Sequence, residues 1–224
     1  MTIPSIEGLE RVQPMALPPL YAITDQPLTG LSHLELVKHL IAGGATLIQL
    51  RDKVTDGRTF YELAHQVMEY ARPHGVKIII NDRVDIALAV NADGVHVGQD
   101  DLPPAAARQL LGPSKLIGYS THSLDQALEA DQFPIDYIAV GPVFQTQTKE
   151  NPSPVVGLEL VRRVATQVSK PVVAIGGIPP ERISEVLQAG ATSVALISGL
   201  LLPVDSLAGR TRSLLSALCH QGKI

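Results

Sequence analysis

The chain has 224 residues, 45% of them apolar, a formal net charge of −4 and a single cysteine, Cys219. This length suits one domain with a substantial core, the mild negative charge argues against nucleic-acid binding, and one cysteine excludes an internal disulfide framework. No apolar run approaches the roughly 18 residues of a membrane span, and residues 1–18 lack the pattern of a secretory signal. We therefore expect a cytoplasmic protein with no membrane or nucleic-acid partner, a disordered arm over residues 1–18 and a folded domain over 19–224.

The first half of the chain alternates short apolar runs with segments of helical spacing. Leu34, Val37 and Ile41 recur three and four positions apart, which indicates a helix with one apolar face. Short continuous apolar runs bounded by turn residues indicate buried strands. Strands are predicted at 20–24, 46–50, 77–80 and 94–97, and helices at 31–42, 59–72, 84–90 and 103–112.

The second half repeats this alternation. Ser123 suits the N-cap of a helix, and Pro180 suits the first turn of another. The intervening segment 141–157 is longer than most connections, and loops of this size often act as lids. Strands are predicted at 116–119, 137–140, 172–175 and 193–197, and helices at 123–130, 158–168, 180–190 and 204–219.

Eight strands that alternate with helices predict parallel pairing with right-handed crossovers. Eight such units in this length favour an α/β fold with a single closed (βα)8 TIM barrel, and an open doubly wound sheet is the alternative. The active site of such a barrel lies at the carboxyl ends of its strands. The residues that follow each strand are therefore the candidates for chemistry.

Charged residues follow the second, third and fourth predicted strands. Gln49, Arg51 and Lys53 alternate and so share one side of the chain, where a guanidinium fork and an ammonium group suit phosphate. Asp82 and Asp101 follow neighbouring strands, and two such carboxylates repel unless a cation such as Mg2+ lies between them. The pattern indicates a Mg2+-diphosphate site, with a solvated loop or a surface cluster of ion pairs as the alternatives.

A second phosphate site is indicated near the last two strands. Gly176–Gly177 and Ser198–Gly199 follow these strands, where barrels frequently bind phosphate through closely approaching main-chain N–H groups. A tight turn is the alternative interpretation of these glycines. The segment 146–149, with two threonines, a glutamine and a lysine, could serve either anion.

The polar residues near the fifth strand predict no serine nucleophile. Ser120 has His122 as its nearest candidate base, but no orienting acid is evident nearby. His96 lies inside the fourth strand, where we expect a packed or supporting residue, and no histidine spacing suggests zinc. Two unequal anion sites without a nucleophile indicate group transfer with diphosphate release, and isomerisation or decarboxylation of one bisphosphate remains the alternative.

Six motifs together closely resemble the thiamine-phosphate synthase family, over nearly the whole chain from Tyr21 to the last predicted helix. In combination they are highly specific, whereas most of them are weak signals singly. The motifs are Gln49-Leu50-Arg51-Asp52-Lys53, Asn81-Asp82-Arg83, the run 94–102, the run 118–122, the segment 141–149 and the run 174–178.

The resemblance implies a transferase of thiamine biosynthesis. The family joins hydroxymethylpyrimidine diphosphate to a thiazole phosphate, or to its carboxylated form, through Mg2+-assisted loss of diphosphate before the thiazole nitrogen attacks. By this resemblance Arg51, Lys53, Ser120 and Lys149 are catalytic, and Asp82 and Asp101 hold Mg2+. It further assigns Gln49, Leu50, Arg51, Asp52, Lys53, Asn81, Ser120 and Lys149 to the pyrimidine diphosphate, and Thr146, Gln147, Thr148, Gly177, Ile197 and Ser198 to the thiazole phosphate.

Two rival functions remain beside the synthase. A related thiazole tautomerase would handle only the thiazole half and could use His122 as its acid or base. A non-catalytic thiamine-phosphate-binding protein could keep the glycine loops without the acids. The complete set of acids and cations favours a synthase with two small phosphorylated substrates, and the oligomeric state is left open.

Overall fold

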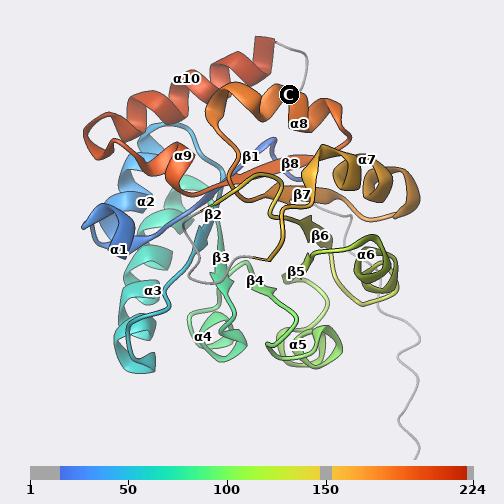
Figure 1. The fold of residues 1–224 in the computed structure, drawn as a ribbon. Coiled ribbons are helices and arrows are strands. Elements are labelled where there is room, and N and C mark those ends of the chain that lie inside the picture. The colour runs from blue at the N-terminus through green and yellow to red at the C-terminus, as the bar shows by residue number, and fades with distance from the viewer. Residues whose placement is uncertain (1–15, 147–152, 221–224) are drawn as a thin grey trace, which may run out of the picture.

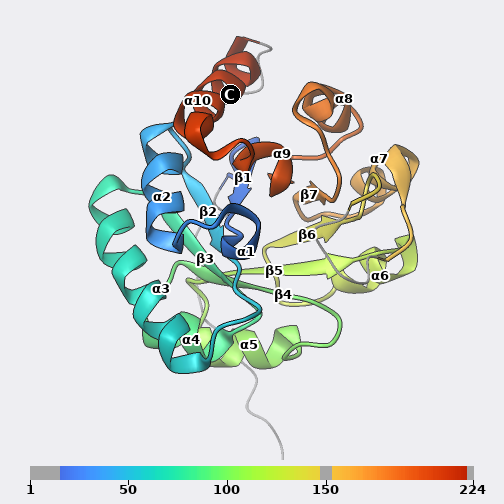
Figure 2. The same ribbon diagram turned by 60° about the vertical axis from the view of Figure 1, so that its left-hand side comes forward.

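A computed structural model describes residues 16–146 and 153–220. Eight parallel strands follow one another in chain order around a closed barrel, and helices between consecutive strands surround it (Figures 1 and 2). The last strand pairs with the first through Tyr21 and Ala195. This closure confirms the predicted (βα)8 barrel and rules out the open sheet. Of the predicted arm over residues 1–18, residues 1–15 lie outside the described part of the chain.

The strands are short, and their sequences explain their burial. Valine, isoleucine and leucine predominate, as expected for parallel strands that are covered on both faces. All eight predicted strands are confirmed to within two residues at each end. The strands are β1 (Leu20–Ile23), β2 (Leu47–Leu50), β3 (Lys77–Asn81), β4 (Gly94–Val97), β5 (Leu116–Thr121), β6 (Tyr137–Val140), β7 (Val172–Ile175) and β8 (Ser193–Leu196).

All eight predicted helices are present, and the described part of the chain holds two further α-helices that were not predicted, beside a 3-10 turn at Arg72–His74. The unpredicted ones, α1 and α9, have four residues each, too few to show a periodic apolar face. The predicted helices over 180–190 and 204–219 each begin with a 3-10 turn. The helices are α1 (Gln26–Thr29), α2 (His33–Ala42), α3 (Gly57–Ala71), α4 (Val84–Ala89), α5 (Pro104–Leu111), α6 (Leu124–Ala130), α7 (Gly157–Gln167), α8 (Ile183–Gln188), α9 (Ser198–Leu201) and α10 (Leu207–His220).

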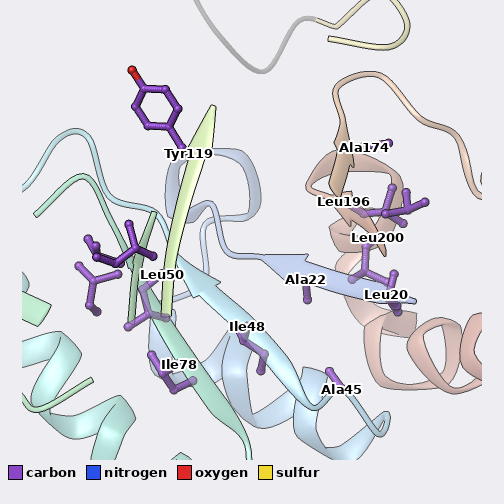
Figure 3. Packing of buried hydrophobic residues seen from close by; sticks show 14 of the residues in the cluster. Leu20, Ala22, Ala45, Ile48, Leu50, Ile78, Tyr119, Ala174, Leu196 and Leu200 are labelled. Carbon is purple, nitrogen blue, oxygen red and sulfur yellow. The ribbon is translucent and has the colours of Figure 1, made fainter. Parts of the chain in front are cut away.

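Alternate residues of each strand divide the core into two layers. Leu20, Ala22 and Ile48 belong to the large cluster between the strands and the helices, and Figure 3 shows this outer layer with its small and branched side chains. Tyr21 and Ile79 belong to a separate cluster inside the barrel. A strand side chain therefore either packs against helices or faces the barrel interior, where a ligand could reach it.

The barrel interior changes character along its axis. Leu17, which precedes β1, joins the inner apolar cluster and so helps to fill the amino end of the barrel. Nearer the carboxyl ends the inner side chains include the buried polar residues Gln49, Asn81 and His96. The buried polar side chains therefore lie toward the carboxyl end of the barrel, where active sites of this fold are found. Among the described residues, no helix is long and apolar enough to cross a membrane.

Candidate active site

Two cavities open at the carboxyl ends of the strands. The inner cavity, of about 420 Å³ including its open mouth, lies in the barrel interior. The side cavity, of about 710 Å³ on the same measure, lies over β5 to β8. The inner cavity is lined by Tyr21, Ile23, Gln49, Arg51, Asn81, His96, Ser120, Tyr137, Ala139, Val173, Ile175, Ala195 and Ile197.

The two cavities share part of their walls. Ser120 and Ile197 line both, as do three apolar residues of β6, β7 and β8, namely Ala139, Ile175 and Ala195. A molecule in the inner cavity and a molecule in the side cavity would therefore be neighbours across this shared wall. The side cavity is otherwise lined by Thr121, His122, Gly141, Pro142, Thr146, Ser153, Gly176, Gly177, Ile178, Leu196, Ser198 and Gly199.

Asn81 gives the inner cavity an unsatisfied donor. The residue ends β3 and is only 7% exposed, yet its side-chain Nδ2 is buried with no hydrogen-bond partner among the described residues. A buried polar group without a partner costs free energy, on the order of 1–3 kcal/mol. The geometry therefore favours a ligand, or a water molecule, that offers an acceptor to Asn81.

Arg51 is held at the mouth of the inner cavity by a residue that sequence reasoning missed. Its Nη1 atom donates to Asp25 Oδ2 at 2.7 Å, and both side chains are largely buried. Asp25 also caps α1, because its Oδ1 accepts from the Leu28 main-chain N–H at 3.0 Å. The short helix α1 thus fixes the carboxylate that orients the guanidinium.

Asp52 stabilises the loop after β2. Its Oδ1 accepts from the main-chain N–H groups of Val54 and Thr55 at 2.9 Å each. Its Oδ2 lies 3.1 Å from Nε2 of the buried His33 in α2. Burial disfavours ionisation of Asp52, but these hydrogen bonds outweigh it and lower its pKa.

The neighbours of Arg51 therefore do not all face the mouth. The Asp52 side chain is 1% exposed and directed toward His33. The Leu50 side chain is fully buried in the layer between strands and helices (Figure 3). Of the residues assigned to the pyrimidine diphosphate, these two can support the site only through the main chain or through loop geometry.

Asp82 and Asp101 form an acidic rim beside Lys53. Lys53 Nζ pairs with Asp82 Oδ2, and Asp101 Oδ2 accepts from the Gly98 main-chain N–H at 2.7 Å. Burial raises the pKa of Asp101, and the nearby Asp82 carboxylate raises it further. Asp82 also has a φ of 60°, a left-handed conformation that is uncommon outside glycine. Strain of this kind is often found at functional sites.

The acidic rim could hold a cation only with help from a ligand. Within residues 16–146 and 153–220, no group of three or more histidine, cysteine, aspartate or glutamate side chains could hold a metal ion. Two carboxylates are nevertheless the protein contribution that Mg2+ commonly takes, the rest being water and phosphate oxygens. Asp82 and Asp101 repel each other, and a hard cation such as Mg2+ bound between them would remove this repulsion.

The partner of Ser120 differs from the one expected. Ser120 Oγ lies 2.8 Å from His96 Nε2, whereas His122 Nδ1 bonds to the carbonyl oxygen of Gly141. The interpretation of His122 as the nearest base is therefore wrong, because Ser120, near the end of β5, meets His96 of the neighbouring strand β4, whereas His122, which follows β5, bonds to the main chain after β6. His96 is packed, which is one of the two expectations for it: its ring stacks on Tyr137 at 5.6 Å. Its other nitrogen meets the Tyr137 hydroxyl, and these contacts within residues 16–146 and 153–220 form no serine-hydrolase triad.

The glycines after β7 make room for the loop that follows β6. Main-chain N–H groups of Val143 and Phe144 donate to the carbonyls of Ile175 and Gly176, both at 2.9 Å. Gly177 has a φ of 63°, and a Cβ there would lie 2.2 Å from the Gln145 carbonyl oxygen. The close approach seen at Gly177 is therefore one between two main-chain segments of the protein, and the phosphate contact of these glycines stays a prediction.

The residues assigned to the thiazole phosphate fall into two groups. Thr146, Gly177, Ile197 and Ser198 all line the side cavity, so the structure brings them together. Gln147 and Thr148 lie outside the described residues, as does Lys149, which was assigned to the diphosphate.

Sequence reasoning also missed Tyr21 and Tyr137 in the wall of the inner cavity. Both are strand residues that alternate with outward-facing aliphatic residues. A polar atom at an inward position of an otherwise aliphatic strand is the signal that could have identified them. Which inward residues meet across the barrel depends on closure and stagger, which the strand sequences do not state.

Comparisons with known proteins agree with this geometry. A family model described as thiamine monophosphate synthase matches residues 20–200. A thiamine-phosphate synthase of Desulfitobacterium hafniense is 44% identical over 187 residues, which cover 83% of this chain and 90% of that protein. One of Chloroflexus aurantiacus is 46% identical, with 83% and 86% covered.

A solved structure shows the same relationship in three dimensions. Thiamine phosphate pyrophosphorylase from Pyrococcus furiosus has a TM-score of 0.80 and 38% identity, and the match covers 90% of this chain and 95% of that one. A thiamine phosphate pyrophosphorylase from Bacteroides thetaiotaomicron, at 18% identity and a TM-score of 0.66, shows the shared fold alone. The chain belongs to the thiamine monophosphate synthase family.

Proposed function

We propose that this protein is a thiamine-phosphate synthase. It joins 4-amino-5-hydroxymethyl-2-methylpyrimidine diphosphate to 4-methyl-5-(2-phosphoethyl)thiazole and releases diphosphate; with the carboxylated thiazole as substrate, carbon dioxide is released as well. The observation that carries this proposal is the wall shared by the two cavities at Ser120, Ala139, Ile175, Ala195 and Ile197. Joining two molecules requires reacting atoms about 3–3.5 Å apart, and adjoining cavities suit that need.

The inner cavity suits the pyrimidine ring. Its wall combines apolar side chains with polar side chains at separate points, among them Gln49, Asn81 and Ser120. The unpaired Nδ2 of Asn81 supplies a donor for a ring nitrogen. A heterocycle with several nitrogens would satisfy these groups, whereas an aliphatic ligand would leave them unpaired.

The diphosphate would lie at the rim, between the cations and the acids. Arg51 and Lys53 neutralise phosphate charge, and we propose that Lys149 joins them from outside the described residues. Asp82 and Asp101 would hold Mg2+, which when bound neutralises charge on the leaving diphosphate. The largely buried ion pair with Asp25 holds the Arg51 guanidinium before the substrate arrives, and the more exposed Lys53 ammonium lies beside Asp82.

The side cavity suits the thiazole phosphate. Gly177 and Ser198 line it just after β7 and β8, where main-chain N–H groups commonly bind phosphate, and Thr146 lines it from the loop after β6. We propose that Gln147 and Thr148 complete this phosphate site. The thiazole ring would then face Ile197 in the shared wall and thus the inner cavity.

The reaction requires the protein to stabilise the charge of the leaving group and requires no nucleophilic side chain. The bond between the methylene carbon and the diphosphate oxygen breaks, and its electron pair leaves with the oxygen. The thiazole nitrogen then supplies the electron pair for the new carbon–nitrogen bond. Neither step transfers a proton, so Arg51 and Lys53 act by neutralising the leaving group. Ala139 and Ile175 exclude the water that would otherwise capture the intermediate.

The rival functions explain fewer of these features. A thiazole tautomerase or a binding protein for thiamine phosphate would leave the acidic rim of Asp82 and Asp101 without a purpose. Both substrates of a synthase are charged phosphate esters that stay on one side of a membrane. We therefore place the reaction in the cytoplasm, with these two small molecules as the partners.

The test is direct synthesis. Purified protein is mixed with the pyrimidine diphosphate, the thiazole phosphate and Mg2+, and thiamine phosphate and diphosphate are quantified by chromatography. We expect equal amounts of both products, and none when either substrate is omitted. Absence of thiamine phosphate under conditions in which a known synthase forms it would refute the proposal.

A further inference from the structure

A continuous chain of hydrogen bonds runs along the wall of the inner cavity. Gln49 Nε2 donates to the Tyr21 hydroxyl at 2.9 Å, and the Tyr21 and Tyr137 hydroxyls lie 3.0 Å apart. The Tyr137 hydroxyl lies 3.1 Å from His96 Nδ1, and His96 Nε2 lies 2.8 Å from Ser120 Oγ. The polar chain thus links β2, β1, β6, β4 and β5, and both of its ends line the cavity.

Packing fixes the rings of this chain independently of the hydroxyl groups. Tyr137 fills the space above Gly118, where a Cβ would lie 2.1 Å from the Tyr137 Cζ atom. Its ring stacks on His96 at 5.6 Å and meets Tyr21 edge to face at 6.0 Å. Replacing a tyrosine here by phenylalanine would therefore keep the ring and remove only the hydrogen-bonding atom.

Each tyrosine contributes one proton to the chain. Burial raises the pKa of Tyr21, although its hydrogen bonds to Tyr137 and Gln49 oppose the shift. Burial also raises the pKa of Tyr137, and Tyr21 adds to that effect. A hydroxyl group has one proton, and a neutral imidazole has one donor and one acceptor nitrogen. Every link then holds one proton if all the protons point the same way along the chain.

The chain accordingly has two consistent orientations. In the first, Gln49 donates to Tyr21, Tyr21 donates to Tyr137, and Tyr137 donates to His96. His96 then donates to Ser120, whose own hydroxyl proton points into the cavity. Gln49 then has its carboxamide oxygen left for a ligand. In the second, Ser120 donates to His96, the protons run back to the Gln49 oxygen, and the Gln49 amino group is left instead. Mixed orientations leave a buried link with two protons or none, which is unfavourable.

We propose that this polar chain couples Gln49 to Ser120, so that one end presents a donor to the bound heterocycle whenever the other presents an acceptor. The proposal rests on the proposed function, in which the heterocycle is an aminopyrimidine. Such a ring carries a donor amino group and acceptor nitrogens, and so it can match both ends in one orientation. A ring that offers only hydrogen-bond acceptors can pair with one end of the chain. The other end then presents an acceptor to an acceptor of the ring.

The coupling is tested by binding and not by turnover, since the amino group also affects the chemistry. Dissociation constants are measured by calorimetry for the pyrimidine diphosphate and for its analogue with hydrogen in place of the amino group. The measurements are made with Mg2+ and without the thiazole phosphate. In Tyr137→Phe both ends can donate at once. We expect its preference for the amino compound to fall about tenfold relative to the parent protein.

Two further variants make the result interpretable. Tyr21→Phe breaks the next link and should relax the preference similarly. Tyr119→Phe removes a hydroxyl group from β5 that no described residue hydrogen-bonds. The Tyr119 ring packs on Phe133 and belongs to the outer cluster that Figure 3 shows, so the preference of Tyr119→Phe should match that of the parent protein.

The outcomes separate the coupling from the proposed function. An unchanged preference in folded Tyr137→Phe and Tyr21→Phe, or equal weakening of both ligands, would overturn the coupling and leave the synthase intact. If the parent protein binds neither pyrimidine diphosphate, the assignment of the inner cavity to that substrate fails, and the coupling falls with it.

Discussion

The two phosphate sites that we propose are built from different parts of the chain. The rim beside the inner cavity uses charged side chains, with Arg51 held by Asp25 and Lys53 by Asp82. The side cavity is lined by small residues, among them Gly177 and Ser198, whose main-chain N–H groups we propose as the phosphate ligands. A site made of side-chain charges is sensitive to single changes of charge, whereas a site made of main chain is sensitive to changes of backbone shape. The same barrel end can therefore hold two phosphates by separable means.

The largest effect is expected from a change of charge at the proposed diphosphate site. Asp101→Asn keeps the size of the side chain and an acceptor for the Gly98 N–H, but removes the negative charge that we assign to Mg2+. We expect kcat to fall by about two to three orders of magnitude, the cost typical of losing one electrostatic stabiliser. Affinity for the thiazole phosphate, measured by calorimetry, should stay unchanged.

The neighbouring acid is the matched control for that variant. Asp100 is exposed at the surface, and Asp100→Asn makes the same change of charge one residue away. It should retain nearly full activity. Parallel loss of thiazole-phosphate affinity in Asp101→Asn would contradict the division into two separable sites.

A middle-sized effect is expected in the main-chain half. Gly177→Ala places a Cβ 2.2 Å from the Gln145 carbonyl oxygen, so the loop after β6 must shift. We expect KM for the thiazole phosphate to rise about tenfold, a loss of about 1.4 kcal/mol. The dissociation constant of the pyrimidine diphosphate should change less than twofold, as steady-state and binding measurements can show.

Gly30→Ala separates the clash from the backbone strain. Gly30 has a similar φ of 72° but nothing within 4 Å of its would-be Cβ. This variant carries the cost of a left-handed alanine without moving the loop, so KM should stay near that of the parent. A raised KM in both variants would show that general destabilisation, and not the displaced loop, is responsible.

The smallest effect is expected in the pH dependence of thermal stability, again for Asp101→Asn. Because burial and Asp82 raise the pKa of Asp101 above its ordinary value of 3.8, the folded protein binds this proton more tightly than the unfolded chain. Ionised Asp101 therefore destabilises the metal-free fold as pH rises above that range. Asp101→Asn should raise Tm at pH 7 by roughly 1–3 °C, the size expected for a partly exposed group in a chain of this length.

This gain should disappear as the pH falls below about 3.8, where Asp101 is protonated in both states. Thermal unfolding in a chelator, followed by circular dichroism, measures both limits. A lower Tm at pH 7 would mean that the hydrogen bond from Gly98 outweighs the repulsion, and that the rim is not poised for a cation.

Local patterns in the sequence predict most of the fold and the rim. Eight buried strands and eight helices follow from periodicity and turn residues, because each signal lies within a few neighbouring positions. Arg51, Lys53, Asp82 and Asp101 could be identified because residues that follow parallel strands collect at one end of a barrel. The helices α1 and α9 could not, since a single turn has no period.

The tertiary structure alone decides which side chains meet. Asp25 orients Arg51 from 26 positions away, and Tyr21 meets Tyr137 across 116 positions. Strand sequences state which residues point inward, but the closure and stagger of the barrel set the pairs. The sequence by itself therefore determined the barrel and the kinds of charge at its mouth. The closed barrel decided that two cavities share a wall and that Ser120 is linked to Gln49.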